Sequence, residues 1–253
     1  MKIGLVQFNP KWEDKKINQS RINHLLETQS FNVDILIFPE LTLTGFTMQS
    51  GDFAEKMDGQ TIDYFSLLAR NHSCHIIAGF IEDDGGMYFN TLVHIDPLGH
   101  LMCKYRKIHP FAYSGEDKHY GSGSHTVVSE VKGMSLGLSI CYDLRFPELY
   151  RQYAKQGVDI IIDIANWPKN RIEHWYTLLK ARSIENQCFM VGVNRVGRGN
   201  SIGYSGWSSV FHPFGNELLC MKEIEKLGII ELFIEEILTT RSKYPFLKDI
   251  RLI

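Results

Sequence analysis

The chain has 253 residues, enough for one large domain or two small ones with a substantial buried core. Its hydrophobic fraction of 44% and charged fraction of 22% are ordinary for a soluble globular protein. With 27 basic and 29 acidic residues the net charge is −2, and no basic block indicates a nucleic-acid-binding surface.

The first residues, MKIGLVQFNPKWEDKK, lack the charged-then-apolar order of a signal peptide. No apolar run approaches the ~20 residues that span a bilayer. We therefore expect a cytoplasmic protein that binds neither membranes nor nucleic acid.

The five cysteines are odd in number and irregularly spaced, so we expect neither a disulfide framework nor a zinc ribbon. Four of them are interpreted as small buried residues, namely Cys74, Cys103, Cys188 and Cys220. His72 and His75 form an H-x-x-H pattern, but they lie at a helix-to-strand junction without carboxylates, so we expect no metal site.

In chain order, the first half of the sequence predicts short strands that alternate with helices. The predicted elements are strands over 2–9, 33–40 and 74–82, helices over 18–29 and 62–72, a hairpin over 86–107 and a loop over 111–123. Pro97 and Gly99 supply the turn of the hairpin.

The second half continues the alternation. The predicted elements are strands over 134–143, 158–167, 188–194 and 226–234, helices over 146–157 and 171–187, a hairpin over 205–220 and an irregular tail over 239–253. Pro147 lies in the first turn of the shorter helix and Gly157 just beyond its end. In the longer helix the apolar residues Ile172, Trp175 and Leu179 share one face.

Two apolar runs, DILIF and DIIIDIA, indicate strands that are covered on both faces. Strands that alternate with helices favour the α/β class. Because no linker, low-complexity stretch or fixed-period repeat interrupts the chain, we expect a single domain over 1–253.

Three predicted strands end on reactive side chains, the position at which α/β proteins collect active groups. The residues are Glu40, Lys107 and Cys141. Taken singly, each has an ordinary explanation. Glu40 could be a solvated residue at a strand end, Lys107 a surface charge and Cys141 a packed thiol.

Together the three residues supply the groups that acyl transfer needs. A free thiol has a pKa of about 8.5 and needs a base or a nearby cation. Glu40 can accept the proton, Lys107 can stabilise an oxyanion, and the backbone N–H of Tyr142 can be a second oxyanion donor. A Cys-His-Asn arrangement stays open as the competing cysteine chemistry, with ten histidines available.

The contexts IFPEL, YRKIHPF and ICYDLRFPEL around these residues resemble the nitrilase (carbon–nitrogen hydrolase) superfamily, whose catalytic Glu, Lys and Cys occur in this order. The segments ANWPKNRIEHWYTLLKARSIENQ, GVNRVG and YSGWS extend the resemblance. It runs from GLVQ to YPFLKD, nearly the whole chain.

The resemblance implies an α/β fold, a four-layer α-β-β-α sandwich of two mixed β-sheets, which forms a homodimer. It also implies no metal and no organic cofactor. Many members carry a second glutamate before the cysteine strand, which here is Glu116, to bind Lys107 or orient the substrate amide. The alternative for Glu116 is a solvated loop carboxylate.

Within the superfamily, CYDLRFPEL and the NWP segment look most like the ω-amidase branch. These enzymes hydrolyse the terminal amide of short dicarboxylic monoamides such as 2-oxoglutaramate and 2-oxosuccinamate. Arg171 is the first candidate for the distal carboxylate of such a substrate. Arg145 is the second, with an ion pair to Glu148 or Asp143 as its alternative.

Three aromatic residues are expected either to wall a small apolar slot or to belong to the core, namely Trp167, Phe111 and Phe146. Trp207 in YSGWS departs from the small or acidic residue usual at that position. It is expected to narrow the pocket or to fill a subunit contact.

Two other functions remain open at this point. The first is another branch of the same superfamily, an N-carbamoyl amino acid hydrolase or a nitrilase. The second is a catalytically silent binding or scaffold protein on the same fold, which the presence of Glu40, Lys107 and Cys141 disfavours.

Overall fold

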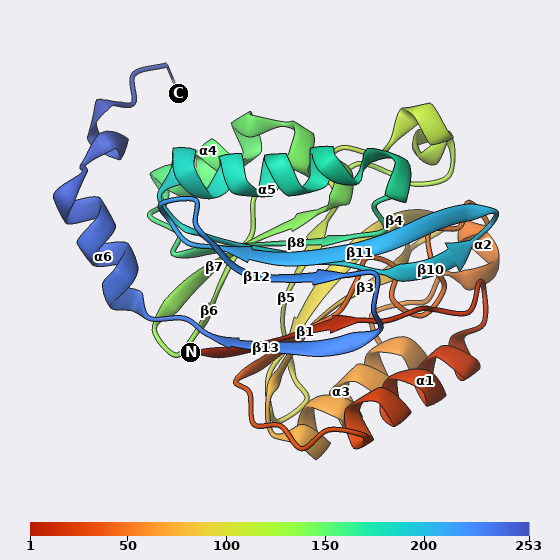
Figure 1. The fold of residues 1–253 in the computed structure, drawn as a ribbon. Helices are drawn as coiled ribbons and strands as arrows, with labels where there is room; N and C mark the ends of the chain where they lie inside the picture. The colour runs from red at the N-terminus through yellow and green to blue at the C-terminus, as the bar shows by residue number, and fades with distance from the viewer. Residues whose placement is uncertain (253) are drawn as a thin grey trace.

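The computed structural model describes residues 1–252. Two β-sheets stack face to face in the middle of the molecule, and helices cover their outer faces (Figure 1). The four-layer α-β-β-α sandwich of two mixed sheets is therefore confirmed.

The first sheet has six strands in the order β13-β1-β2-β3-β4-β5. Their bounds are β1 (Lys2–Gln7), β2 (Ile35–Ile37), β3 (His75–Asp84), β4 (Met87–Ile95), β5 (Leu101–Arg106) and β13 (Lys226–Glu231). The strands β1, β2 and β3 run parallel, and the others join antiparallel.

The second sheet has seven strands, in the order β10-β11-β9-β8-β7-β6 with β12 beside β11. Their bounds are β6 (Val128–Val131), β7 (Met134–Ile140), β8 (Ile160–Ala165), β9 (Phe189–Asn194), β10 (Val196–Gly199), β11 (Ile202–Phe211) and β12 (Glu217–Lys222). Here β7, β8 and β9 run parallel at the centre.

Two long helices cover each sheet. They are α1 (Lys15–Glu27) and α3 (Gln60–His72) on the first sheet, and α4 (Pro147–Lys155) and α5 (Ile172–Asn186) on the second (Figure 1). The Asp14 carboxylate caps α1 by accepting the backbone N–H of Ile17, and Pro147 occupies the first turn of α4, where its missing N–H costs nothing.

The alternation of side chains along β8 explains why this run is apolar except at Asp163. Ile160, Ile162 and Ile164 pack between the two sheets, while Ile161 and Ala165 pack under α4 and α5. A strand buried on both faces has no position for a solvated side chain, so the DIIIDIA pattern follows from its place in the sandwich.

Several element boundaries differ from the prediction. The strand predicted over 33–40 pairs only over Ile35–Ile37, because the chain turns away at Pro39 and Glu40. The strand predicted over 134–143 ends at Ile140, and a 3-10 turn, Cys141–Arg145, follows. Two further 3-10 turns occupy the predicted loop.

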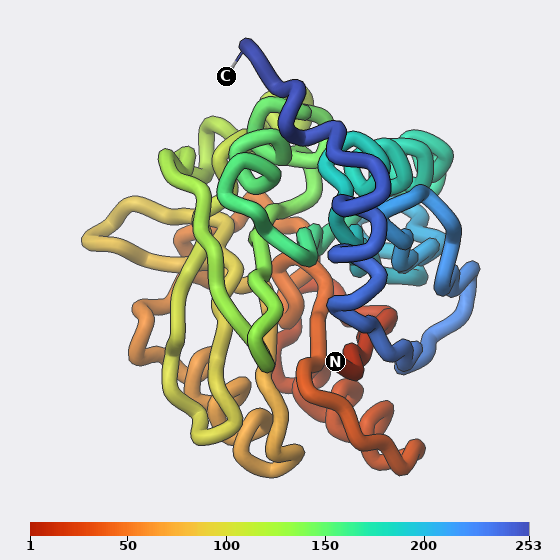
Figure 2. Tube along the Cα trace, turned by 90° about the vertical axis from the view of Figure 1, so that its left-hand side faces the viewer, coloured from red at the N-terminus to blue at the C-terminus, as the bar shows by residue number. Residues whose placement is uncertain are grey.

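The prediction of an irregular tail is partly wrong. A helix, α6 (Ile234–Lys243), begins where the last strand was expected to end and continues into the tail. Figure 2 shows the segment after α6 continuing along the outside of the molecule. The short helix α2 (Ser50–Phe53) and the strands β6 and β10 were not predicted.

Cysteine burial also differs in part from the expectation. Cys74 and Cys188 are buried, but Cys103 and Cys220 are only half-buried. Among residues 1–252, none of the helices has the length and apolar character that crossing a bilayer requires.

Candidate active site

Glu40 lies where the chain leaves the end of β2, and its side chain is buried. The next residue, Leu41, has a φ of 43°, so the backbone turns sharply here. A Cβ atom at Gly79 would lie 2.6 Å from the backbone nitrogen of Leu41. Glycine at position 79 is therefore required for the Glu40 turn to pack against β3.

Lys107 follows β5 directly and is 1% exposed. Its Nζ lies 2.9 Å from Oε1 of Glu40 and 2.9 Å from Oε2 of Glu116. One buried ammonium thus bridges two buried carboxylates, an arrangement that charge-assisted hydrogen bonds stabilise.

Glu116 lies in the loop before β6, at the first residue of a 3-10 turn, and is buried. Its carboxylate accepts the backbone N–H of Phe111 as well as Lys107. The alternative of a solvated loop carboxylate is therefore wrong, and the structure brings together Glu40, Lys107 and Glu116.

Two asparagines that sequence reasoning missed complete this network. Asn90 on β4 donates from Nδ2 to Oε1 of Glu40 at 2.7 Å and to Oε1 of Glu116 at 2.9 Å. Asn166, just after β8, donates its backbone N–H to Oε2 of Glu40 at 2.8 Å. The available signal was a polar residue inside or directly after an apolar strand.

Cys141 is the first residue after β7 and has a φ of 53°, a left-handed conformation that is strained for a residue with a Cβ. Its backbone N–H donates to Oδ1 of the buried Asp163 at 2.7 Å, which holds the turn. The next N–H, that of Tyr142, belongs to the second residue of the 3-10 turn, where early N–H groups lack partners within the turn.

Burial and neighbouring charges set the protonation states of these groups. Burial disfavours the charge on Lys107, but Glu116 and Glu40 outweigh it and raise the pKa of Lys107 well above its usual value. Burial also raises the pKa of Glu116, and burial followed by the charge of Glu40 raises the pKa of the Cys141 thiol. The lysine is therefore charged and the thiol protonated at neutral pH.

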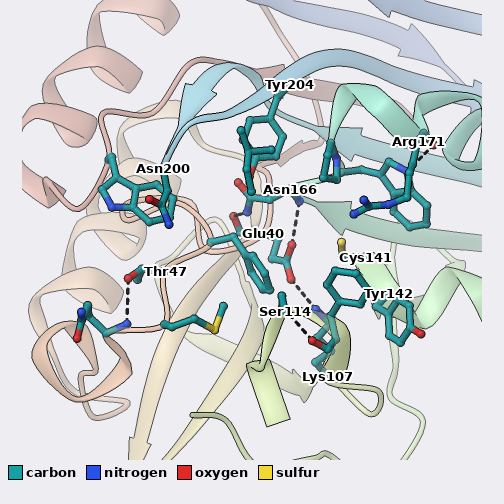
Figure 3. A pocket seen from close by; sticks show the side chains of 18 of the residues that line it. Glu40, Thr47, Lys107, Ser114, Cys141, Tyr142, Asn166, Arg171, Asn200 and Tyr204 are labelled. Carbon is teal, nitrogen blue, oxygen red and sulfur yellow. Dashed lines mark hydrogen bonds and ion pairs between the residues drawn. The ribbon is translucent and has the colours of Figure 1, made fainter. Parts of the chain in front are cut away.

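These residues lie at one end of β-strands that border a cavity of about 500 Å³ (Figure 3). The cavity is lined by Glu40, Lys107 and Cys141 and also by Tyr142, Arg145, Arg171, Trp167 and Phe111. No histidine among residues 1–252 lines it, which disfavours the Cys-His-Asn alternative.

Two predicted wall residues lie elsewhere. Phe146 does not line the cavity, and its ring stacks on His109 with centroids 3.8 Å apart. Trp207 does not line it either, because its ring packs edge-on against Tyr176 and beneath the Nζ of Lys222. The expectation that Trp207 narrows the pocket is therefore wrong.

Arg145 projects into the cavity rather than into a surface ion pair. Its guanidinium carbon lies 4.8 Å from the centre of the Trp167 ring, and a guanidinium nitrogen lies 3.3 Å from Nδ1 of His174. Asp143 pairs with His109 instead, so the ion-pair alternative for Arg145 is wrong.

Arg171 lies on the same wall of the cavity, with its guanidinium carbon 5.5 Å from the centre of the Phe111 ring. Both arginines line the same cavity, and burial, followed by the charge of Arg171, lowers the pKa of Arg145. Within residues 1–252 neither guanidinium forms an ion pair with a carboxylate. The wall is therefore suited to an anionic group.

The residues on the remaining part of the cavity wall were not predicted from the sequence. This part is lined by Trp12, Glu13, Phe46, Thr47, Met48, Gln49, Asn200, Ile202 and Tyr204. In the described part of the chain, no cluster of three or more His, Cys, Asp or Glu side chains has the arrangement of a metal site.

The sequence model of the carbon–nitrogen hydrolase family matches residues 2–239. The chain belongs to this family. A 2-oxoglutaramate amidase from Bacillus subtilis is 31% identical to this hydrolase over 251 residues, which cover 98% of this chain and 97% of the relative. An omega-amidase from Yersinia enterocolitica is 32% identical over 255 residues, with 98% and 96% covered.

A solved structure supports the same assignment. A CN-hydrolase superfamily protein from Xanthomonas campestris, with an arsenic adduct in its active site, matches with a TM-score of 0.95. It is 32% identical, and the match covers 100% of this chain and 98% of that chain. This carbon–nitrogen hydrolase is therefore an amide-hydrolysing enzyme of the nitrilase superfamily, and the silent-scaffold alternative is set aside.

Proposed function

We propose that this enzyme hydrolyses the terminal amide of short dicarboxylic monoamides of the 2-oxoglutaramate and 2-oxosuccinamate type. The observation that carries the proposal is one cavity with Cys141, Glu40 and Lys107 at one place and two unpaired guanidiniums, Arg145 and Arg171, on a nearby wall. The names of the relatives from Bacillus and Yersinia support the same substrate class.

In the proposed reaction Glu40 accepts the thiol proton, and Sγ of Cys141 attacks the amide carbon. Lys107 and the N–H of Tyr142 stabilise the oxyanion that develops. The C–N bond breaks as Glu40 returns the proton to the leaving nitrogen, which leaves a thioester on Cys141. Water then attacks the thioester as Glu40 accepts a proton from it. The C–S bond breaks, the Cys141 sulfur takes the proton back from Glu40, and the carboxylate product is released.

Glu116 and Asn90 act on this reaction through Lys107 and Glu40. The Glu116 carboxylate accepts a second hydrogen bond from the Lys107 ammonium, and Asn90 donates to both carboxylates and so ties them together. Each carboxylate is thereby held in a geometry that needs little rearrangement during proton transfer.

Asn90→Leu is expected to lower kcat by on the order of ten-fold or more while KM changes little. The substitution keeps the side-chain volume but removes two charge-assisted hydrogen bonds, each of which contributes about 1.5–3 kcal/mol. Steady-state kinetics with a thermal melt measures the effect, with the exposed Asn32→Leu as the matched control. If Asn90→Leu has the same kcat as the wild type, Asn90 does not position the two carboxylates.

We propose that the distal carboxylate of the substrate binds Arg171, with Arg145 beside it. Stacking on Trp167 orders the Arg145 guanidinium before substrate binds, which reduces the entropy lost on binding. Trp167 and Phe111 then form the apolar sides of the slot.

Arg171→Ala is expected to raise KM for acidic monoamides while sparing a neutral amide of equal length. The lost charge-assisted hydrogen bonds correspond to roughly ten- to a hundred-fold in affinity. Arg145→Ala is measured in parallel on the same pair of substrates. If Arg171→Ala discriminates acid from neutral amide as well as the wild type does, Arg171 does not bind the distal carboxylate, and Arg145 is the next residue to test.

The substrate class is tested by ammonia release from 2-oxoglutaramate and 2-oxosuccinamate, compared with N-carbamoyl amino acids and simple nitriles. The proposal expects the highest kcat/KM for the two oxo acids. Preference for a carbamoyl compound or a nitrile assigns the enzyme to one of the other branches left open by the sequence.

We further propose that the enzyme is a cytoplasmic homodimer. Apolar side chains are exposed at Phe233, Leu238 and Phe246, along and beside α6, which supports a contact with a second copy. All five cysteines are free, as expected in a reducing compartment. Light scattering of the purified protein measures the mass in solution, and a monomer would contradict the proposal.

A further inference from the structure

The cavity extends on both sides of Glu40. In Figure 3, Cys141 and Arg171 lie on one side of the Glu40 carboxylate, and Thr47 and Asn200 lie on the other. We call the second side the far arm. It contains Thr47, Asn200 and Glu13, whose side chain accepts a hydrogen bond from Thr47, together with the cavity-lining residues next to these in the chain, Trp12, Phe46 and Met48.

A primary monoamide leaves the far arm unused. Its acyl part lies between Cys141 and the arginine wall, and its leaving group is ammonia. The cavity of about 500 Å³ is within the size range of pockets that enclose much larger ligands. Because the leaving nitrogen must take a proton from Glu40, any substituent on that nitrogen points away from Cys141 and into the far arm.

Half of the side chains that define the far arm are apolar and half are polar. Trp12, Phe46 and Met48 supply an aromatic and thioether surface, and the Phe46 ring is 5.2 Å from Nζ of Lys107. Such a surface favours an alkyl chain over a second charged group close to the reaction centre.

Glu13 is the single carboxylate of the far arm. Its side chain accepts a hydrogen bond from the hydroxyl of Thr47, and its backbone N–H donates to the carbonyl of Thr44 at 2.9 Å. Within residues 1–252 no lysine, arginine or histidine forms an ion pair with it. Glu13 is thus a fixed, half-buried negative charge that faces the cavity without a protein cation.

We propose that the far arm binds the amine part of a secondary amide, with an alkyl chain against Trp12, Phe46 and Met48 and a terminal ammonium at Glu13. This inference rests on the proposed function and extends its substrate class. Attack by Cys141 forms the thioester and breaks the C–N bond, and the amine leaves with the proton from Glu40. Water then hydrolyses the thioester, so one amide and one water give one carboxylic acid and one amine.

The test compares three amides of one acyl group: succinamic acid, N-pentylsuccinamic acid and N-(4-aminobutyl)succinamic acid. The last two have the same length and differ in a terminal methyl or ammonium group. Chromatography of the released amine gives kcat/KM for the wild type, for Glu13→Gln and for the control Glu235→Gln, an exposed carboxylate on α6.

The wild type is expected to cleave the aminobutyl amide with a kcat/KM higher than that of the pentyl amide by roughly ten- to a hundred-fold, the range for a charge-assisted hydrogen bond. Glu13→Gln is expected to bring this ratio close to one, and Glu235→Gln to leave it unchanged. An unchanged ratio in Glu13→Gln, or no cleavage of either secondary amide by the wild type, overturns the proposal.

The comparison is repeated with butanamides of the same amines, which lack the distal carboxylate. Cleavage of succinamic acid alone refutes only the far-arm proposal. Cleavage of the butanoyl series in preference to the succinyl series refutes the preference for dicarboxylic monoamides, while the aminobutyl-to-pentyl ratio still tests Glu13.

Discussion

Cys141→Ala is expected to abolish amide hydrolysis while leaving the fold intact. The substitution removes only Sγ from a half-buried side chain that lines the cavity, so little packing is lost. The backbone φ of 53° is equally strained for alanine, and the hydrogen bond from the residue 141 N–H to Asp163 remains. The measurement is ammonia release from an acidic monoamide, together with circular dichroism and a thermal melt.

Two buried cysteines provide the matched controls for this result. Cys74→Ala and Cys188→Ala remove a thiol of the same size from positions outside the cavity. Both are expected to stay active, with at most a modest loss of stability from the small space created. Substantial turnover by Cys141→Ala would contradict the assignment of Cys141 as nucleophile.

Glu40→Gln is expected to slow formation of the thioester by on the order of a hundred-fold or more, the contribution of a general base. The amide keeps the shape of the carboxylate, and its oxygen can still accept the backbone N–H of Asn166. It cannot accept the thiol proton, and burial keeps Cys141 protonated at neutral pH. The acylation rate is measured by rapid mixing with an activated substrate.

The outcome of Glu40→Gln also shows whether Glu40 or a neighbouring residue is the general base. If acylation proceeds at a near-normal rate, the base lies elsewhere, and Glu116 is the next residue to test because it shares Lys107 with Glu40. His109 is a weaker alternative, since its Nδ1 binds Asp143 at 2.7 Å and its ring lies outside the cavity wall.

The sequence was sufficient for the fold and for the main reactive groups because both leave local signals. The doubly buried strand β8 appears as a run that is apolar except at Asp163, and the buried residues Ile172, Trp175 and Leu179 of α5 recur at helical spacing. Cys141 follows β7 directly and Glu40 comes shortly after the end of β2, positions at which side chains turn out of a sheet. Their surrounding motifs then indicated the superfamily, which the comparisons confirmed.

The remaining site residues could not be predicted from the sequence, because their places in the site depend on contacts between segments that are far apart in the chain. Asn90 binds Glu116 and Glu40 across separations of 26 and 50 residues, and nothing in its local sequence indicates either partner. Glu13 likewise meets the cavity only because its loop packs against Thr44 and Thr47. The misplacement of Phe146 has the same origin, since proximity to Cys141 in sequence did not decide which way its ring points.

The buried carboxylates beside Cys141 also bear on how the enzyme withstands oxidants. Hydrogen peroxide attacks thiolates and hardly reacts with neutral thiols. Because burial and the charge of Glu40 keep Cys141 protonated, the nucleophile is a poor target for sulfenic acid formation between turnovers. In the proposed reaction Glu40 accepts the thiol proton as Sγ attacks a bound amide. The reactive thiolate therefore forms during turnover, and the nucleophile stays protected from oxidants when no substrate is bound.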